Sequence, residues 1–265
     1  MLSKVFSLHL FSLFATLVTD AEKELHTCPF TKISTLSSPS YEKHVSQLSN
    51  YFIDLNCSLT VNQLKKDLKF RKHKKKENKF FGNNIKIKSL LDNLLELPLN
   101  STFLWIDATT VVLTSVKFPI SEIRNFLGDS DLLVARESGK KKANIGVLLM
   151  RNTETTQEFF GKLLTSIGEH HWDQGIACCM LNGKTNYNCK GIQPFRNIKY
   201  RFFPASIVGV EGIFSKRECI KTLTKIRGRV DRPSIVKLVG LKSPRDSCLE
   251  IFDTELQNKD YGTNV

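Results

Sequence analysis

The residue best suited to chemistry in this sequence is Asp107, a single carboxylate that interrupts an apolar run. Phe103-Leu104-Trp105-Ile106 precede it, and the apolar run resumes at residues 111–113. Such runs, rich in Trp, Ile and Val, are typical of strands buried on both faces of an α/β sheet. A charge there is costly unless it stands at the carboxyl end of the strand, where these sheets open their ligand crevice. Asp107 is therefore predicted to be functional, and the alternative is an aspartate that only caps a turn.

Two other short motifs with polar residues lie at the borders of apolar runs. Asn144-Ile145-Gly146 opens an apolar run that continues to Met150, and Trp172-Asp173-Gln174 introduces the apolar run 175–181. As features of local structure alone, Asp173 would cap a helix and Asn144 would lie in a turn. Both motifs are therefore candidates for function, and each has a structural alternative.

The elements that must position these residues alternate along the chain. Apolar runs predict strands, and apolar positions at three- and four-residue spacing predict helices. The expected strands are 31–36, 59–61, 103–113, 131–135, 144–152, 200–205 and 235–240, and the expected helices are 41–55, 85–97, 119–127, 153–167, 175–181 and 215–226. Pro98 ends the second of these helices, and Gly128 ends the third. The alternation predicts an α/β fold with a mostly parallel central sheet flanked by helices.

The composition is that of a folded and basic chain. With 265 residues, of which 41% are hydrophobic, the chain can bury a sizeable core, and global disorder is not expected. The net charge of +13 suggests an anionic partner. However, residues 65–79 hold nine Lys and Arg against two acidic residues, a pattern typical of a solvated loop. A polyanion binder acting through this segment is a third hypothesis, but no nucleic-acid motif accompanies it, and no nucleic-acid partner is expected.

The first residues have the pattern of a targeting segment. A lysine precedes the apolar run 5–18, and Ala21 offers a cleavage site, so a signal peptide is expected over residues 1–21. The run is short for a membrane span. An uncleaved signal anchor, which would make a single-pass type II membrane protein, is the alternative. Acceptor sequons at Asn56 and Asn100 agree with a chain in the lumen of the ER or Golgi, or with secretion.

The seven cysteines contain no C-x-x-C pair, so zinc ribbons and thioredoxin-like chemistry have no support. In an oxidising lumen we expect one to three disulfides and at least one unpaired thiol. Cys178 and Cys179 are adjacent and cannot readily pair with each other, and one of them is expected in the core. The pairing of the cysteines stays open.

Taken in order, the three landmarks resemble the GT-A type of nucleotide-diphospho-sugar glycosyltransferases. The strand ending at Asp107 matches the Asp-x-Asp strand, residues 144–152 match an Asn-x-Gly-x-x-Leu-x-Arg-Asn strand, and Asp173-Gln174 matches an Asp-Gln pair after a Trp. The resemblance is greatest to the galactosyl/mannosyl/xylosyltransferase family (glycosyltransferase family 34). It implies a GT-A-like domain over residues 28–252. Residues 253–265 are polar and show no periodicity, so a disordered tail is expected there.

The resemblance also implies a reaction. A hexose or pentose would move from a nucleotide-sugar donor, a UDP- or GDP-sugar, to a glycan or glycoprotein acceptor, with retention of configuration. In the family a Mn²⁺ ion held by carboxylates stabilises the diphosphate, and Asp107 is the expected metal ligand. The second carboxylate of the motif is replaced by Thr109, and a hydroxyl is a much poorer ligand, so support for Mn²⁺ is weak. The alternative is a catalytically degenerate, secreted glycan- or protein-binding member of the same fold.

A second departure concerns the strand in which the family places a histidine ligand before a glycine. Here Lys237 stands in that place, within Val236-Lys237-Leu238-Val239-Gly240. A fixed ammonium could replace the charge of the metal, so a metal-independent variant with Lys237 and Lys242 near the diphosphate is a concrete hypothesis. A family lysine on the helix before the motif corresponds to Lys86 or Lys88.

The same resemblance places Asn144, Gly146, Asp173 and Gln174 near the donor sugar. Asp173 would orient or deprotonate an acceptor hydroxyl, and Gln174 would lie beside the anomeric carbon. His170 and His171 adjoin this pair but lack ligand spacing to a third residue, so we expect them on the surface.

Overall fold

The computed structural model describes residues 28–65, 81–113, 120–137, 142–167, 173–182, 189–213, 215–227, 233–240 and 247–252. The expected signal peptide, nearly all of the basic segment 65–79, the two adjacent histidines, Lys242 and the polar tail lie outside these residues. None of the helices within the described ranges is long and apolar enough to cross a bilayer.

Helices and strands alternate along most of the chain, as the apolar pattern predicts. In order they are β1 (Lys32–Ser37), η1 (Pro39–Tyr41), α2 (Glu42–Asp54), β2 (Leu59–Gln63), α3 (Phe81–Glu96), β3 (Thr102–Ile106), β4 (Thr110–Val112), α4 (Ile120–Leu127), β5 (Leu132–Arg136), β6 (Ala143–Arg151), α5 (Glu154–Ser166), α6 (Asp173–Asn182), β7 (Tyr200–Phe202), β8 (Val208–Ile213), α7 (Lys216–Arg227) and β9 (Ile235–Gly240). Gly128 follows α4 with a φ of 52°, the left-handed conformation that commonly ends a helix.

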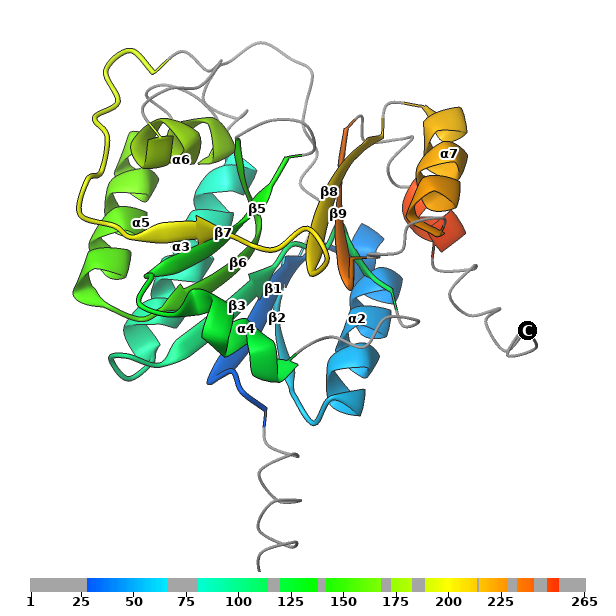
Figure 1. The fold of residues 1–265 in the computed structure, drawn as a ribbon, viewed down its shortest axis with the longest axis horizontal. Helices are drawn as coiled ribbons and strands as arrows, with labels where there is room; N and C mark the ends of the chain where they lie inside the picture. Colours follow the sequence, from blue (N-terminus) through cyan, green and yellow to red (C-terminus); the bar gives the residue numbers. More distant parts are fainter. Residues whose placement is uncertain are drawn as a thin grey trace, which may run out of the picture.

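Six strands form the central sheet in the order β2-β1-β3-β6-β5-β7 (Figure 1). The pairs β1–β2, β1–β3 and β5–β7 are parallel, whereas β6 is antiparallel to both of its neighbours, β3 and β5. The prediction of an α/β fold with a mostly parallel sheet is therefore confirmed, with β6 as the strand that runs against the other five. All residues of β3 are buried, and so are all of β6 except Arg151, because helices cover both faces of the sheet.

The two faces of the sheet build two different parts of the core. Phe103 and Trp105 point towards α3, α5 and α6, whereas Leu104 and Ile106 point towards α2 and α4. This alternation follows from the two-residue period of a strand. Figure 1 shows α3, α5 and α6 grouped on one side of the sheet, with α2 on the other.

A second, three-stranded sheet with the order β4-β9-β8 lies beside α7 (Figure 1). The prediction of one kinked strand over residues 103–113 is wrong, because the chain turns at Asp107–Thr109 and β4 pairs with β9 rather than continuing in the main sheet. Strand β8 was not predicted. The expected strand 200–205 is also shorter than predicted, since β7 ends at Phe202, before Pro204, which lacks the N–H that a ladder needs.

Three disulfides are present among the described cysteines, Cys28–Cys57, Cys179–Cys189 and Cys219–Cys248. Cys178 is a free and buried thiol, as expected for one member of the adjacent pair. Burial, with a contribution from the charge of Glu137, raises the pKa of Cys178 to about 12. Cys178 is therefore a core residue rather than a reactive nucleophile.

Candidate active site

Asp107 follows the last residue of β3 and closes a strand that is otherwise apolar and buried. Its backbone N–H donates to the carbonyl oxygen of Gly146 at 2.7 Å, and the indole Nε1 of Trp105 donates to its Oδ1 at 3.0 Å. The side chain of Asp107 is 22% exposed, so it is accessible from the carboxyl edge of β3. The geometry is that of an anchored carboxylate at the edge where α/β sheets bind ligands.

Lys86, on the helix α3, is the first cation that contacts this carboxylate. Its Nζ lies 2.9 Å from Oδ1 of Asp107, donates to the carbonyl oxygen of Ile145 at 2.9 Å, and lies 3.6 Å from Oδ2 of Asp173. By contrast, Lys88 is exposed and pairs with Asp92 on its own helix at 2.7 Å. Of the two lysines left open by the sequence, Lys86 is therefore the one in the cluster.

Lys237, on β9, is the second cation. Its Nζ donates to Oδ2 of Asp107 at 2.8 Å and also to the hydroxyl of Thr109. Thr110 is the register partner of Lys237 in the β4–β9 pair, and the N–H of Leu238 donates to the carbonyl of Thr109 at 3.1 Å. The pairing of β4 with β9 thus brings together Lys237 and Asp107, which are 130 residues apart in the sequence.

These contacts set the charge states in the cluster. Burial alone would raise the pKa of Asp107, but the ammonium groups of Lys237 and Lys86 outweigh it and hold this pKa well below its ordinary range. Burial would lower the pKa of Lys86, but Asp107 and Asp173 raise it above its ordinary value. Asp173 differs, because burial and the charge of Asp107 together raise its pKa despite Lys86. Asp173 is therefore the carboxyl group of the cluster best suited to exchange a proton.

A second hydrogen-bonded group adjoins the first and centres on Gln174. The side chain of Asn144 donates to Oε1 of Gln174 at 2.9 Å, and Oδ1 of Asn144 accepts from the N–H of Gly146 at 2.9 Å. Nε2 of Gln174 donates to Oε1 of Glu137. Asp173 and Gln174 are the first two residues of α6, so the start of one helix joins the two groups.

Glu137 was not among the predicted site residues. It follows the apolar strand β5 as Asp107 follows β3, and this position at the carboxyl end of a buried strand was the available signal. The residues that were predicted all lie in the two connected groups: Lys86, Asp107, Thr109, Asn144, Gly146, Asp173, Gln174 and Lys237. The structure shows that these residues lie close together, and their catalytic and binding roles stay predictions.

The groups around Asp107 do not form a set of ligands that suits a divalent cation. Mn²⁺ and Mg²⁺ take oxygen ligands, whereas both carboxylate oxygens of Asp107 already accept from N–H donors. Position 109 supplies a hydroxyl, and no three His, Cys, Asp or Glu side chains of the described residues are grouped so that they could hold a metal. The metal-ligand role that the resemblance implies for Asp107 is not supported by this donor set.

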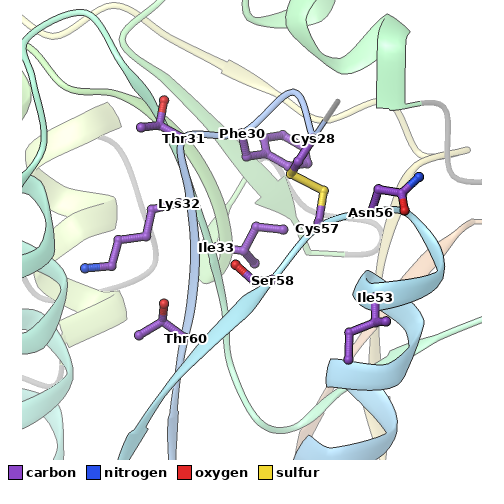
Figure 2. A pocket seen from close by; sticks show the side chains of 10 residues that line it. All are labelled: Cys28, Phe30, Thr31, Lys32, Ile33, Ile53, Asn56, Cys57, Ser58 and Thr60. Carbon is purple, nitrogen blue, oxygen red and sulfur yellow. A yellow bond between two sulfur atoms is a disulfide. The ribbon is translucent and has the colours of Figure 1, made fainter. Parts of the chain in front are cut away.

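A pocket of about 730 Å³ lies elsewhere, at the amino-terminal ends of β1 and β2 (Figure 2). The disulfide Cys28–Cys57 and the side chains of Lys32 and Thr60 are among the groups that line it. Because β1 and β3 are parallel, this pocket and Asp107 lie at opposite edges of the sheet. None of the predicted site residues lines it.

No protein-family model matches the chain, and no curated protein matches it by sequence. Its structure is similar to that of a glycosyltransferase involved in the glycosylation of the major capsid of PBCV-1, with 14% sequence identity and a TM-score of 0.52, over 84% of this chain and 99% of that one. A second similar structure is the galactosyltransferase LgtC in complex with donor and acceptor sugar analogs, with 11% sequence identity and a TM-score of 0.47, over 85% of this chain and 95% of that one. A third is the apo form of mouse xyloside xylosyltransferase 1, with 8% sequence identity and a TM-score of 0.37, over 78% of this chain and 96% of that one. The first similarity, with the sheet order above, shows that this chain has the GT-A fold.

Proposed function

We propose that this chain is a glycosyltransferase that moves a hexose or pentose from a nucleotide-sugar donor to a glycan or glycoprotein acceptor in the secretory pathway. The observation that carries the proposal is the cluster of Lys86, Asp107 and Lys237 at the carboxyl edge of β3 in a chain with the GT-A fold. Breaking a bond between a sugar and a diphosphate leaves negative charge on phosphate oxygens. Fixed cations at that position stabilise this charge in the transition state.

The neighbouring groups suit the other half of the reaction. Asp173 has a raised pKa and lies 3.6 Å from Lys86, so it can take a proton from an acceptor hydroxyl beside the donor. The amide of Gln174 is oriented by hydrogen bonds from Asn144 and to Glu137, which suits a fixed dipole beside the anomeric carbon. In this proposal Gly146 and Asn144 line the donor sugar, and Lys86 and Lys237 face the diphosphate.

Screening UDP- and GDP-sugars by thermal shift tests the proposal, followed by detection of the released nucleotide diphosphate and of the glycosylated acceptor. A donor that binds only the native state raises the melting temperature, by an amount that grows with its concentration over Kd. The variant Asp173→Asn should retain the thermal shift and lose most of the transfer, because only the proton acceptor is removed. If none of the nucleotide sugars shifts the melting temperature, glycosyl transfer is not the function.

The replacement of an expected carboxylate by Thr109 favours a second candidate, a degenerate member of the fold that binds glycans or a protein without catalysis. The same experiments separate the two. Binding of a nucleotide sugar without release of nucleotide diphosphate, with or without acceptors, would favour the second candidate. Release or transfer at a rate abolished by Asp173→Asn would favour the first.

If the protein is secretory, Asn100 is expected to carry an N-linked glycan. Three disulfides persist in an oxidising compartment, and Asn100 is exposed in the turn between α3 and β3 with a φ of 66°. Expressed with its first 27 residues in a eukaryotic host, the protein should carry an N-linked glycan there. Endoglycosidase should lower the apparent mass of the wild type. In the Asn100→Gln variant this decrease should be smaller by the mass of one glycan. Unglycosylated protein with reduced cysteines would contradict the secretory location.

A further inference from the structure

The side chain of Lys237 is unusually enclosed for a lysine. It is 7% exposed, and its ammonium lies between the carboxylate of Asp107 and the hydroxyl of Thr109. Lysine is almost never buried to this degree without a partner, because removing an ammonium from water is costly. Two strands of the small sheet, β4 and β9, hold the chain in the register that places Lys237 there. The fold thus supports one positive charge at a defined point.

Gly146 provides the space for the stem of this lysine. A Cβ built on Gly146 would lie 2.3 Å from Cε and 2.8 Å from Cδ of Lys237, and 2.8 Å from Oδ1 of Asn144. These separations are far inside van der Waals contact, so any larger residue at this position must displace the lysine. The glycine of the Asn-x-Gly run is therefore explained by the close approach of Lys237 to the backbone of β6.

The partners of the ammonium are groups that would otherwise be candidates to ligate a metal. Asp107 and Thr109 follow the end of β3 and are separated by one residue, and the side chains of both accept hydrogen bonds from Lys237. A hydroxyl gives a divalent cation little charge compensation, but it is a good acceptor for one N–H of an ammonium. Lys86 brackets the same carboxylate from the other side, at 2.9 Å. The donors and acceptors of this cluster match an ammonium better than a metal.

We infer that Lys237 is a built-in cation that takes the place of a divalent metal at the donor diphosphate, and that Asp107, Thr109 and Gly146 position it. The inference rests on the proposed function, which supplies the diphosphate. A lysine ammonium is a compact point charge that binds phosphate well. The ammonium of Lys237 lies 2.8 Å from Oδ2 of Asp107, whose side chain is 22% exposed, so a diphosphate bound beside Asp107 would lie near this charge. Lys86 supplies a second charge at the same carboxylate.

This inference predicts nucleotide binding that is independent of metals and dependent on the position of Lys237. UDP and GDP would be titrated into the full chain by calorimetry in EDTA and then with Mn²⁺ or Mg²⁺ in excess. In the wild type the affinity for one of the two should change less than about threefold with the metal. Lys237→Met should weaken binding by roughly 30-fold, the loss of one charge-assisted contact. Lys237→Arg should retain part of the affinity.

Gly146→Ala gives a second test, because it displaces Lys237 and changes no charge. It should weaken binding by roughly 10-fold or more, since a misplaced donor loses most of a directional contact. Two variants are matched controls. Gly161→Ala in α5 meets no atom within 4 Å, and Lys88→Met removes an exposed lysine from the helix that carries Lys86. Both controls should bind within twofold of the wild type, and thermal unfolding would identify any variant that does not fold.

The possible outcomes distinguish a failure of the role of Lys237 from a failure of the proposed function. If UDP or GDP binds the wild type only when Mn²⁺ or Mg²⁺ is present, or if folded Lys237→Met and Gly146→Ala bind as the wild type does, Lys237 is not the cation of the site, and the proposed function stands. If neither nucleotide binds under any condition, the proposed function fails, and the inference fails with it.

Discussion

Replacing Thr109 by Asp and Lys237 by His in one chain is expected to convert the site to metal dependence. The substitutions remove the ammonium and supply a carboxylate and an imidazole beside Asp107, which makes a set of ligands that Mn²⁺ accepts. Affinity for the nucleoside diphosphate should then rise at least roughly 30-fold on adding Mn²⁺, whereas the wild type should change less than about threefold. Calorimetric titration in EDTA and in Mn²⁺ measures the difference directly.

The single variants are the controls for this conversion. Thr109→Asp alone keeps Lys237, so the added carboxylate should pair with the ammonium and give little response to Mn²⁺. Lys237→His alone leaves a hydroxyl at position 109 and should give an intermediate response. A wild type that already responds to Mn²⁺ as the double variant does would contradict the interpretation of Lys237.

Substitution of Lys86 by Met is expected to have the largest effect on both stability and transfer. Lys86 lies 2.9 Å from Asp107 and 3.6 Å from Asp173, and all three side chains are largely enclosed. Removing one partner of a buried ion pair leaves an uncompensated charge and costs about 3 kcal/mol or more. We expect the free energy of unfolding to fall by about that amount and transfer to fall by roughly 100-fold or more, since a fixed cation at the diphosphate is lost.

The dependence on pH gives a sharper readout for Lys86→Met. Burial and Asp107 already raise the pKa of Asp173 in the folded state, and the loss of Lys86 raises it further. An acid whose pKa is higher when folded than when unfolded destabilises the fold at pH values above its folded pKa. It ceases to do so as the pH falls below its unfolded value. The stability deficit of the variant should therefore be greatest at neutral pH and shrink towards pH 4.

Lys86→Met/Asp173→Asn is the matched test of this explanation. Removing both charges should recover much of the lost stability while transfer stays low, because the proton acceptor is also gone. Chemical denaturation at several pH values, with the two single variants alongside, closes the double-mutant cycle. A deficit that is independent of pH, or that Asp173→Asn does not relieve, would mean that Lys86 acts mainly through packing.

Local sequence patterns were sufficient to predict most helices and strands, and they selected residues that the structure places next to one another in the candidate site. A buried strand ending at a carboxylate is visible in residues 103–107 alone, and the alternation of elements led to the correct fold class. The same patterns could not show that the chain leaves the main sheet after Asp107. An apolar run is equally consistent with one long strand and with two short strands in different sheets, because either arrangement buries it.

What the sequence by itself determined is the set of groups available for chemistry and the buried elements that carry them. Only the tertiary structure decided the direct contacts. Lys86 rather than Lys88 contacts Asp107, and the ammonium of Lys237 contacts both Asp107 and Thr109. Gln174 donates to Glu137, and six cysteines form three pairs. The physical reason is range. Helix and strand periodicity is imposed by neighbours within a few residues. These contacts instead depend on how the two sheets and the amino-terminal end of α6 pack against one another.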